Sequence, residues 1–150
     1  MFIRAPRCIA GGCLFNWKLG KPAKDLDFLV TNATREDAYA IEKLGYKLRI
    51  SEGYWGDDRL LCVAQTDVLG VPIDVCFSEI GLAPYVEDFP IRATRITQDV
   101  YGNIWECPLG VEDFEQKALV CSIEKMQDDY VQQYINRYRV KCPDWTVGYV

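Results

Sequence analysis

Two carboxylates stand one residue apart at the start of an apolar segment, residues 25–30, with the sequence DLDFLV. The apolar run predicts a buried strand over residues 26–30. Side chains two positions apart in a strand point to the same side, so Asp25 and Asp27 would converge on one point. Like charges so placed repel each other unless something, usually a divalent cation, neutralises them. The segment therefore predicts a strand whose first end either meets a cation or is simply exposed to solvent.

A third carboxylate, Asp74, is the single acid of a second strand-forming run, residues 71–77 (VPIDVCF). If the two strands are neighbours, three carboxylates gather at one end of a sheet. That arrangement suits Mg²⁺, which takes carboxylate and phosphate oxygens and keeps water in its other positions. Each piece also occurs by chance, so an exposed strand end stays the alternative.

The glycine pair Gly11-Gly12 precedes a predicted helix over residues 12–19. Its free backbone amides could hold an anion at the positive end of the helix dipole, or the turn could simply need flexible residues. The first 24 residues contain basic residues and no acidic one, although the net charge of the chain is -5. Such asymmetry indicates either a surface that meets phosphate or a solvated lysine loop. An acidic chain also disfavours nonspecific coating of duplex nucleic acid.

The rest of the chain alternates short helices and strands without a repeat or a linker, which predicts a single domain over residues 1–150. Thr34 opens a capping box for a helix that Gly45 ends, and Ala38, Ile41 and Leu44 line one face of this helix. Further helices are expected before Pro84, at 111–117 and at about 123–140. Further strands are expected at 46–51, 60–65, 93–97, 103–107 and 118–121, with a hairpin at 66–70, a turn at 98–102, a loop at 52–58 and a loose tail after Pro143.

Composition excludes several classes of site. Histidine is absent, so catalysis must rest on carboxylates, Lys, Arg, Tyr or a metal. The seven cysteines, with no CxxC pair, fit neither a disulfide framework nor a zinc ribbon, and we expect them reduced in the core. No apolar run approaches the ~18 residues of a membrane span, and the N-terminus does not resemble a signal peptide. We therefore expect a soluble, cytoplasmic protein with no membrane partner.

Residues 11–27 (GGCLFNWKLGKPAKDLD) resemble the head-domain signature of tRNA nucleotidyltransferases (CCA-adding enzymes) and bacterial poly(A) polymerases. These enzymes belong to the DNA polymerase beta nucleotidyltransferase superfamily. A second block, residues 88–113, is similar to the family's DFTINA segment and to the strand, PFGG turn and acidic helix that follow it. The resemblance spans roughly residues 8–121. It implies the nucleotidyltransferase fold, which is α+β with a mixed, largely antiparallel sheet and helices packed on it.

The resemblance also implies a reaction, the magnesium-dependent transfer of an NMP from an NTP such as ATP to an acceptor hydroxyl. The expected acceptor is an RNA 3′ end like that of tRNA, and Mn²⁺ is the alternative metal. The residues that the resemblance assigns to catalysis and metal binding are Asp25, Asp27 and Asp74. Those that it assigns to nucleotide binding are Gly11, Gly12, Lys24 and Arg92.

Some positions depart from the family pattern. Phe15-Asn16 stands where the family has Arg-Asp, and Val86-Glu87 replaces a pair of arginines. Arg92 replaces an asparagine and either recovers a phosphate contact or pairs with an acid, and Lys24 can equally be a solvated turn lysine. The alternative function is therefore a noncatalytic protein that retains the fold and binds a nucleotide or a partner. The base, the acceptor and the oligomeric state stay open, and compact chains of this kind are typical of phages.

Overall fold

The computed structural model describes residues 7–24, 26–45, 47–50, 60–125 and 128–150. Its helices are α1 (Gly12–Lys18), α2 (Arg35–Glu42), α3 (Leu82–Glu87), α4 (Pro108–Glu115) and α5 (Asp129–Lys141), with 3₁₀ helices η2 (Arg92–Thr94) and η3 (Ile123–Lys125). Its strands are β1 (Arg7–Ala10), β2 (Leu26–Val30), β3 (Lys47–Ile50), β4 (Leu60–Val68), β5 (Val71–Ser78), β6 (Ile96–Asp99), β7 (Ile104–Glu106), β8 (Ala118–Cys121) and β9 (Thr146–Tyr149).

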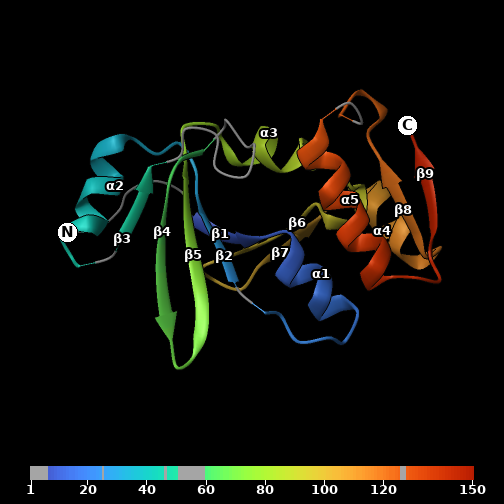
Figure 1. The fold of residues 1–150 in the computed structure, drawn as a ribbon, viewed down its shortest axis with the longest axis horizontal. Helices are drawn as coiled ribbons and strands as arrows, with labels where there is room; N and C mark the ends of the chain where they lie inside the picture. Colours follow the sequence, from blue (N-terminus) through green and yellow to red (C-terminus); the bar gives the residue numbers. More distant parts are fainter. Residues whose placement is uncertain (1–6, 25, 46, 51–59, 126–127) are drawn as a thin grey trace.

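A 7-stranded sheet has the strand order β3-β4-β5-β2-β1-β6-β7 (Figure 1). Its neighbours pair antiparallel except β2 and β5, which are parallel. Strands β8 and β9 form a separate parallel pair, which lies beside α4 and α5 at one end of the molecule (Figure 1). The predicted α+β fold with a mixed, largely antiparallel sheet is confirmed. Within the described residues, no helix has the length and apolarity needed to cross a membrane.

The alternation along β2 and β5 divides the sheet into two faces. Phe28 and Val30 of β2 join Phe77 of β5 in a core that also holds Ala38 of α2. Residues of opposite parity, such as Leu29, lie in a second core with Cys8, Ala10 and Tyr85. Because Asp27 and Asp74 have the parity of Leu29, they belong to the second face, the one that α3 covers farther along the sheet.

A third core joins α1 to the C-terminal part of the chain, and Phe15 lies at its centre with 0% of its surface exposed. The ring of Phe15 makes edge-to-face contacts with Phe114 of α4, Tyr138 of α5 and Trp145, at centroid distances of 5.6, 5.2 and 5.7 Å. Such geometry stabilises aromatic pairs beyond their buried area. Phe15 is therefore a packing residue, which accounts for the departure from arginine at this position.

Several local predictions are confirmed. Strands β2 and β8 cover residues 26–30 and 118–121 as expected. The capping box of α2 is present, since the Thr34 hydroxyl accepts from the Asp37 N–H and the Asp37 carboxylate accepts from the Thr34 N–H. The prediction that this helix extends to Leu44 is wrong, because α2 ends at Glu42, and Leu44 beyond it is 65% exposed.

The hairpin between β4 and β5 is tighter than the predicted turn over residues 66–70. Strand β4 continues to Val68, and Leu69 and Gly70 form the turn with φ values of 53° and 80°. Two consecutive positive φ values are typical of a type I′ turn, whose twist matches that of the strands. The carboxylate of Asp67 accepts from the Gly70 N–H at 2.9 Å. This turn sets the register of the two strands.

Three elements differ in their bounds from the prediction. The strand expected at 93–97 begins later, because η2 occupies its start and the Thr94 hydroxyl donates to the Ile91 carbonyl at 2.7 Å. Helix α4 begins earlier than expected, at Pro108, since proline is favoured at the first helical position. Pro84 lies inside α3 rather than after it, in the first turn, where the missing N–H costs no helical hydrogen bond.

The predicted final helix starts too early and the predicted loose tail is wrong. Helix α5 begins at Asp129, because the Asp128 carboxylate accepts from the Tyr130 N–H at 2.9 Å and caps it. The tail after Pro143 forms β9 and contributes Trp145 to the third core. The other parts of the prediction that involve residues 46, 51–59 and 126 lie outside the described residues.

Substitutions at Phe15 test the aromatic core. We expect Phe15→Ala to lower the free energy of unfolding by about 3–5 kcal/mol, because it leaves a cavity among three rings. Phe15→Leu refills most of that volume and should cost less than half as much. Urea unfolding followed by tryptophan fluorescence measures both, and equal small losses would contradict the packing role.

Candidate functional site

The centre of the site is a pair of aspartates on neighbouring strands. Asp27 of β2 and Asp74 of β5 are direct partners in the parallel register. Directly paired residues of adjacent strands face the same side of a sheet, with strands about 4.8 Å apart. Asp27 is exposed and Asp74 is partly buried, so both carboxylates lie at a surface that solvent or a ligand can reach. The prediction that these two strands are neighbours is confirmed.

The third predicted carboxylate, Asp25, lies outside the described residues. Its share in the site stays a prediction that follows from its position two residues before Asp27. Without it, the described part of the chain contains no group of three His, Cys, Asp or Glu side chains that could hold a metal ion. The structure therefore brings together two of the three predicted ligands.

One neighbour of this pair was not predicted. Gln65 of β4 is the antiparallel partner of Asp74, so Gln65, Asp74 and Asp27 form a row across three strands. The amide of Gln65, which is partly buried, adds a neutral donor and acceptor to the two acidic side chains. A signal for it exists in the sequence, because a two-residue turn at Leu69-Gly70 places Gln65 opposite Asp74 by counting back from the turn.

The glycine pair follows β1 at the end of the strands where Asp27 lies. Strand β1 pairs Ile9 with Phe28, and one more step of this register places Ala10 beside Asp27. The next residue, Gly11, has φ +78° and donates its N–H to the Ile96 carbonyl at 3.0 Å. The backbone thus needs glycine at Gly11, and the position of the pair beside Asp27 agrees with the expected order of the motif.

Gly12 is held against α5. A Cβ atom at Gly12 would lie 2.8 Å from the hydroxyl oxygen of Tyr138, too close for any side chain unless the tyrosine moved. The fold itself therefore explains why both positions are glycine. Their predicted contact with a nucleotide stays a prediction.

Two tyrosines of α5, Tyr134 and Tyr138, lie where the charge of Asp27 acts on them, and the Tyr138 hydroxyl also packs against Gly12. Burial raises the pKa of Tyr138 well above its ordinary value, and the charges of Tyr134 and Asp27 add to the effect. The Tyr134 hydroxyl donates to Thr94 Oγ1 at 3.3 Å, and burial likewise raises its pKa. Both phenols are consequently neutral at physiological pH. Asp27 thus lies near enough to α5 for its charge to act on this helix.

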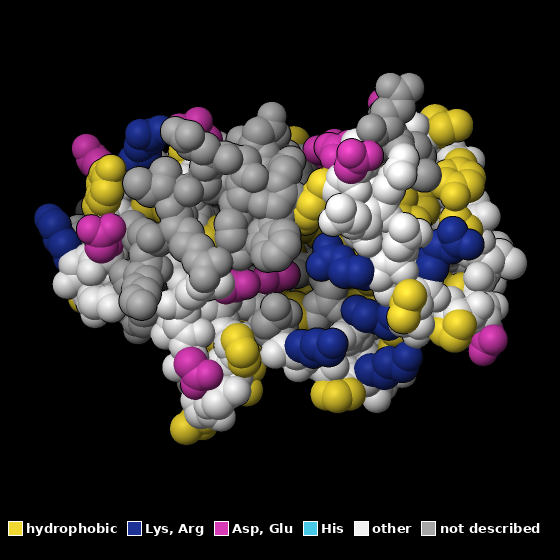
Figure 2. Space-filling model, in the orientation of Figure 1, with side chains coloured by type: hydrophobic (Ala, Val, Ile, Leu, Met, Phe, Trp, Pro, Cys, Tyr) yellow, Lys and Arg dark blue, Asp and Glu magenta, His cyan; other side chains and the backbone are white. Residues whose placement is uncertain are grey.

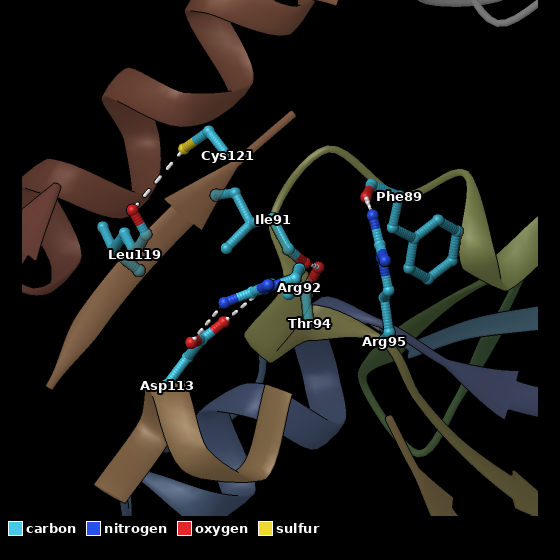
Figure 3. A network of polar contacts seen from close by, with 8 residues as sticks. All are labelled: Phe89, Ile91, Arg92, Thr94, Arg95, Asp113, Leu119 and Cys121. Atoms are coloured by element: carbon cyan, nitrogen blue, oxygen red, sulfur yellow. Dashed lines mark hydrogen bonds and ion pairs between the residues drawn. The ribbon is translucent and has the colours of Figure 1, made fainter. Parts of the chain in front are cut away.

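Arg92 forms an ion pair within the fold (Figure 3). Its Nε and Nη2 donate to the two carboxylate oxygens of Asp113 in α4, both at 2.8 Å, and the Asp113 side chain is buried. The hydrogen bond to Asp113 raises the pKa of the guanidinium. Of the two alternatives for Arg92, pairing with an acid describes the structure, although the acid is buried rather than on the surface. Nucleotide binding by Arg92 stays untested.

Lys24 is exposed in the loop between α1 and β2. Burial lowers the pKa of Lys141 in α5, and the charges of Arg137, Lys21 and Lys24 lower it further. Figure 2 shows Lys and Arg side chains gathered beside the acidic side chains over the strands. Lys24 is thus a solvated loop lysine whose charge acts on Lys141, and its contact with a nucleotide stays a prediction.

Comparisons with known proteins agree with this fold. No protein-family model and no curated protein matches the sequence. A tRNA nucleotidyltransferase complexed with a primer tRNA and an incoming ATP analog has a TM-score of 0.68 and 15% identity, over 95% of this chain and 43% of that one. The Thermotoga maritima CCA-adding enzyme complexed with tRNA has a TM-score of 0.69 and 14% identity, over 95% and 35%. The Bacillus stearothermophilus CCA-adding enzyme in complex with CTP has a TM-score of 0.67 and 16% identity, over 95% and 36%.

This chain therefore has the fold of one part of these enzymes. It spans about two fifths of the length of a matched tRNA-processing enzyme, with 95% of its own residues aligned. The resemblance to the nucleotidyltransferase fold is confirmed at the level of structure. At 14–16% identity it establishes the fold alone.

The pair between Arg92 and Asp113 gives a stability prediction. We expect Asp113→Ala to lower the free energy of unfolding by about 3 kcal/mol, because it leaves a partly buried guanidinium without its partner. Combining it with Arg92→Ala should cost clearly less than the sum of the two single losses. Denaturant unfolding of the parent protein, the two single variants and the double variant measures this coupling. Strictly additive losses would contradict a direct pair.

Proposed function

We propose that the protein is a magnesium-dependent nucleotidyltransferase that moves an NMP from an NTP to the 3′ hydroxyl of an RNA. The observation that supports this proposal is the in-register pairing of Asp27 with Asp74, in a fold shared with tRNA nucleotidyltransferases. Structures with this fold include complexes with tRNA and with CTP, which supports an RNA acceptor and an NTP donor. Because this chain spans less than half of those proteins, their full activity is part of the proposal.

The donor set fits Mg²⁺. Asp27 and Asp74 offer hard carboxylate oxygens at a surface with access to water, and Asp25 would add a third carboxylate two residues before Asp27. When bound, the metal would lower the pKa of the acceptor hydroxyl and would offset negative charge on the transferred phosphate. The protein's own part is to hold Asp27 and Asp74 in fixed positions on paired strands, so that the reacting groups meet in the right geometry. This chemistry needs no histidine.

A noncatalytic nucleotide-binding or partner-binding protein is the second candidate. The observation that favours it is that three residues of the family-like motifs make contacts within the fold. Phe15 lies in an aromatic core, Arg92 pairs with Asp113, and Gly12 contacts Tyr138. In this alternative the fold persists while transfer is lost.

Label transfer separates the two candidates. We expect the protein with Mg²⁺, each labelled NTP and total tRNA to transfer label from at least one NTP. Asp27→Asn should reduce the rate at least about a hundred-fold, because it removes a metal ligand. Glu79→Gln, which removes an exposed carboxylate just beyond β5, is the matched control and should keep the activity. Absence of transfer to RNA with every NTP, from folded protein, would overturn the proposed function.

Metal titration tests the site without turnover. Ligand at about 100 times its dissociation constant stabilises the folded state by about 2.7 kcal/mol, so the melting temperature should rise with Mg²⁺ or Mn²⁺. Asp27→Asn should remove this rise, because it removes a metal ligand, whereas Glu79→Gln should keep it. A melting temperature that ignores both ions, with and without NTP, would rule out the metal site.

A further inference from the structure

Four cationic side chains meet at the junction of α5 with the loop between α1 and β2. Arg137 and Lys141 are four residues apart and therefore lie on one face of α5. The Lys21 ammonium donates to the Lys141 carbonyl at 2.9 Å, which fastens the loop to the end of the helix. The charges of Arg137, Lys21 and Lys24 all act on Lys141. We call these four residues the basic cluster.

Asp27 is the described carboxylate that acts on the same two tyrosines as the basic cluster. Two described ion pairs join Lys18 to Glu106 and Arg92 to Asp113, and neither involves a member of the cluster. Four cations placed together repel each other, and a single carboxylate such as Asp27 offsets only part of their charge, so the cluster favours an anion. Their concentration at one place therefore indicates a polyanionic ligand.

Aromatic rings connect the basic cluster to the carboxylate pair. The Arg137 guanidinium lies 5.6 Å from the ring centre of Tyr134, and the Lys141 ammonium lies 4.7 Å from that of Tyr138. The charges of Arg137 and Asp27 act on both tyrosines. The cations and Asp27 thus border the same two rings, and Figure 2 shows basic and acidic side chains side by side on one face.

We propose that the basic cluster binds the phosphodiester backbone of a single-stranded RNA acceptor next to its 3′ end. This inference rests on the proposed function, because it takes Asp27 and Asp74 as the place where the 3′ hydroxyl reacts. A triphosphate bound through metal at the carboxylates has its charge offset there, whereas the strand that presents the hydroxyl needs cations farther out. The cluster lies against Tyr134 and Tyr138 and extends over α5 and the loop before β2, which suits successive phosphates of a strand. Lys24 accordingly serves the acceptor rather than the NTP.

Salt dependence of RNA binding tests the inference directly. The probe is a short, fluorescently labelled single-stranded RNA, titrated in EDTA without NTP and followed by anisotropy. Four phosphate contacts on a single strand predict a slope of about -2.8 in log K against log salt, or a loss of about fifty-fold from about 50 to about 200 mM. Lys24→Gln combined with Arg137→Gln should halve that slope and weaken binding at low salt about ten-fold, equally for different RNA sequences.

A matched control removes the same charge elsewhere. Arg35→Gln combined with Lys43→Gln neutralises two exposed cations at the two ends of α2, outside the basic cluster, and should leave both affinity and slope unchanged. The substituted side chains are exposed in both double variants, so both should unfold at the parent temperature. Equal losses of RNA affinity in the two double variants would overturn the inference, because binding would then follow net charge alone.

Binding of NTP and of polyglutamate identifies the ligand, and the transfer assay separates this inference from the proposed function. If Lys24→Gln with Arg137→Gln weakens NTP binding and leaves RNA binding intact, the cluster serves the triphosphate and the inference fails. If polyglutamate binds as tightly as RNA and responds equally to the variant, the cluster serves an acidic protein and the inference fails. RNA binding that depends on the cluster, in a protein without transfer activity, would support the inference and overturn the proposed function alone.

Discussion

The parallel pairing of β2 with β5 is the contact on which the candidate site depends. It lies in the middle of a sheet whose other pairs are antiparallel, and it aligns Asp27 with Asp74. Because side chains alternate between faces, a shift of one residue in β2 alone would turn Asp27 to the opposite face from Asp74. The alternating apolar residues prevent that shift, since Phe28 and Val30 fill the core under α2 while Leu29 fills the core under α3. The two cores thus hold the two carboxylates on one side.

The C-terminal part of the chain places α5 beside the glycine pair and beside the loop that precedes β2. Helix α5 lies against the start of α1, where the Tyr138 hydroxyl occupies the space that a side chain at Gly12 would need. The same helix carries Arg137 and Lys141 to the loop that holds Lys24. Phe15 and Trp145 fix this arrangement through edge-to-face contacts rather than through charge. The hydrophobic core therefore determines which charged groups become neighbours.

Much of the local structure could be predicted from the sequence. The strand over 26–30, the capping box at Thr34 and the strand over 118–121 depend on residues close together in the chain, and all three are present. The site was partly predictable, because the apolar runs around Asp27 and Asp74 identified their strands. The pairing of Arg92 with Asp113 and the docking of the tail through Trp145 were not predictable, because each depends on packing between elements distant in sequence.

The sequence by itself determined which functional groups the chain contains and where they lie along it. These are carboxylates within strand-forming segments, a glycine pair before a helix and cations ahead of the first acid, with no histidine. It also determined the capping box at Thr34 and most strand positions, since these follow from interactions within a few residues. Only the tertiary structure decided which of these groups meet. Lys21 and Lys141 are 120 positions apart and lie in contact, and Phe15 is a core residue because α4, α5 and Trp145 close around it. Such contacts arise from the packing of the whole chain, which no short stretch of sequence specifies.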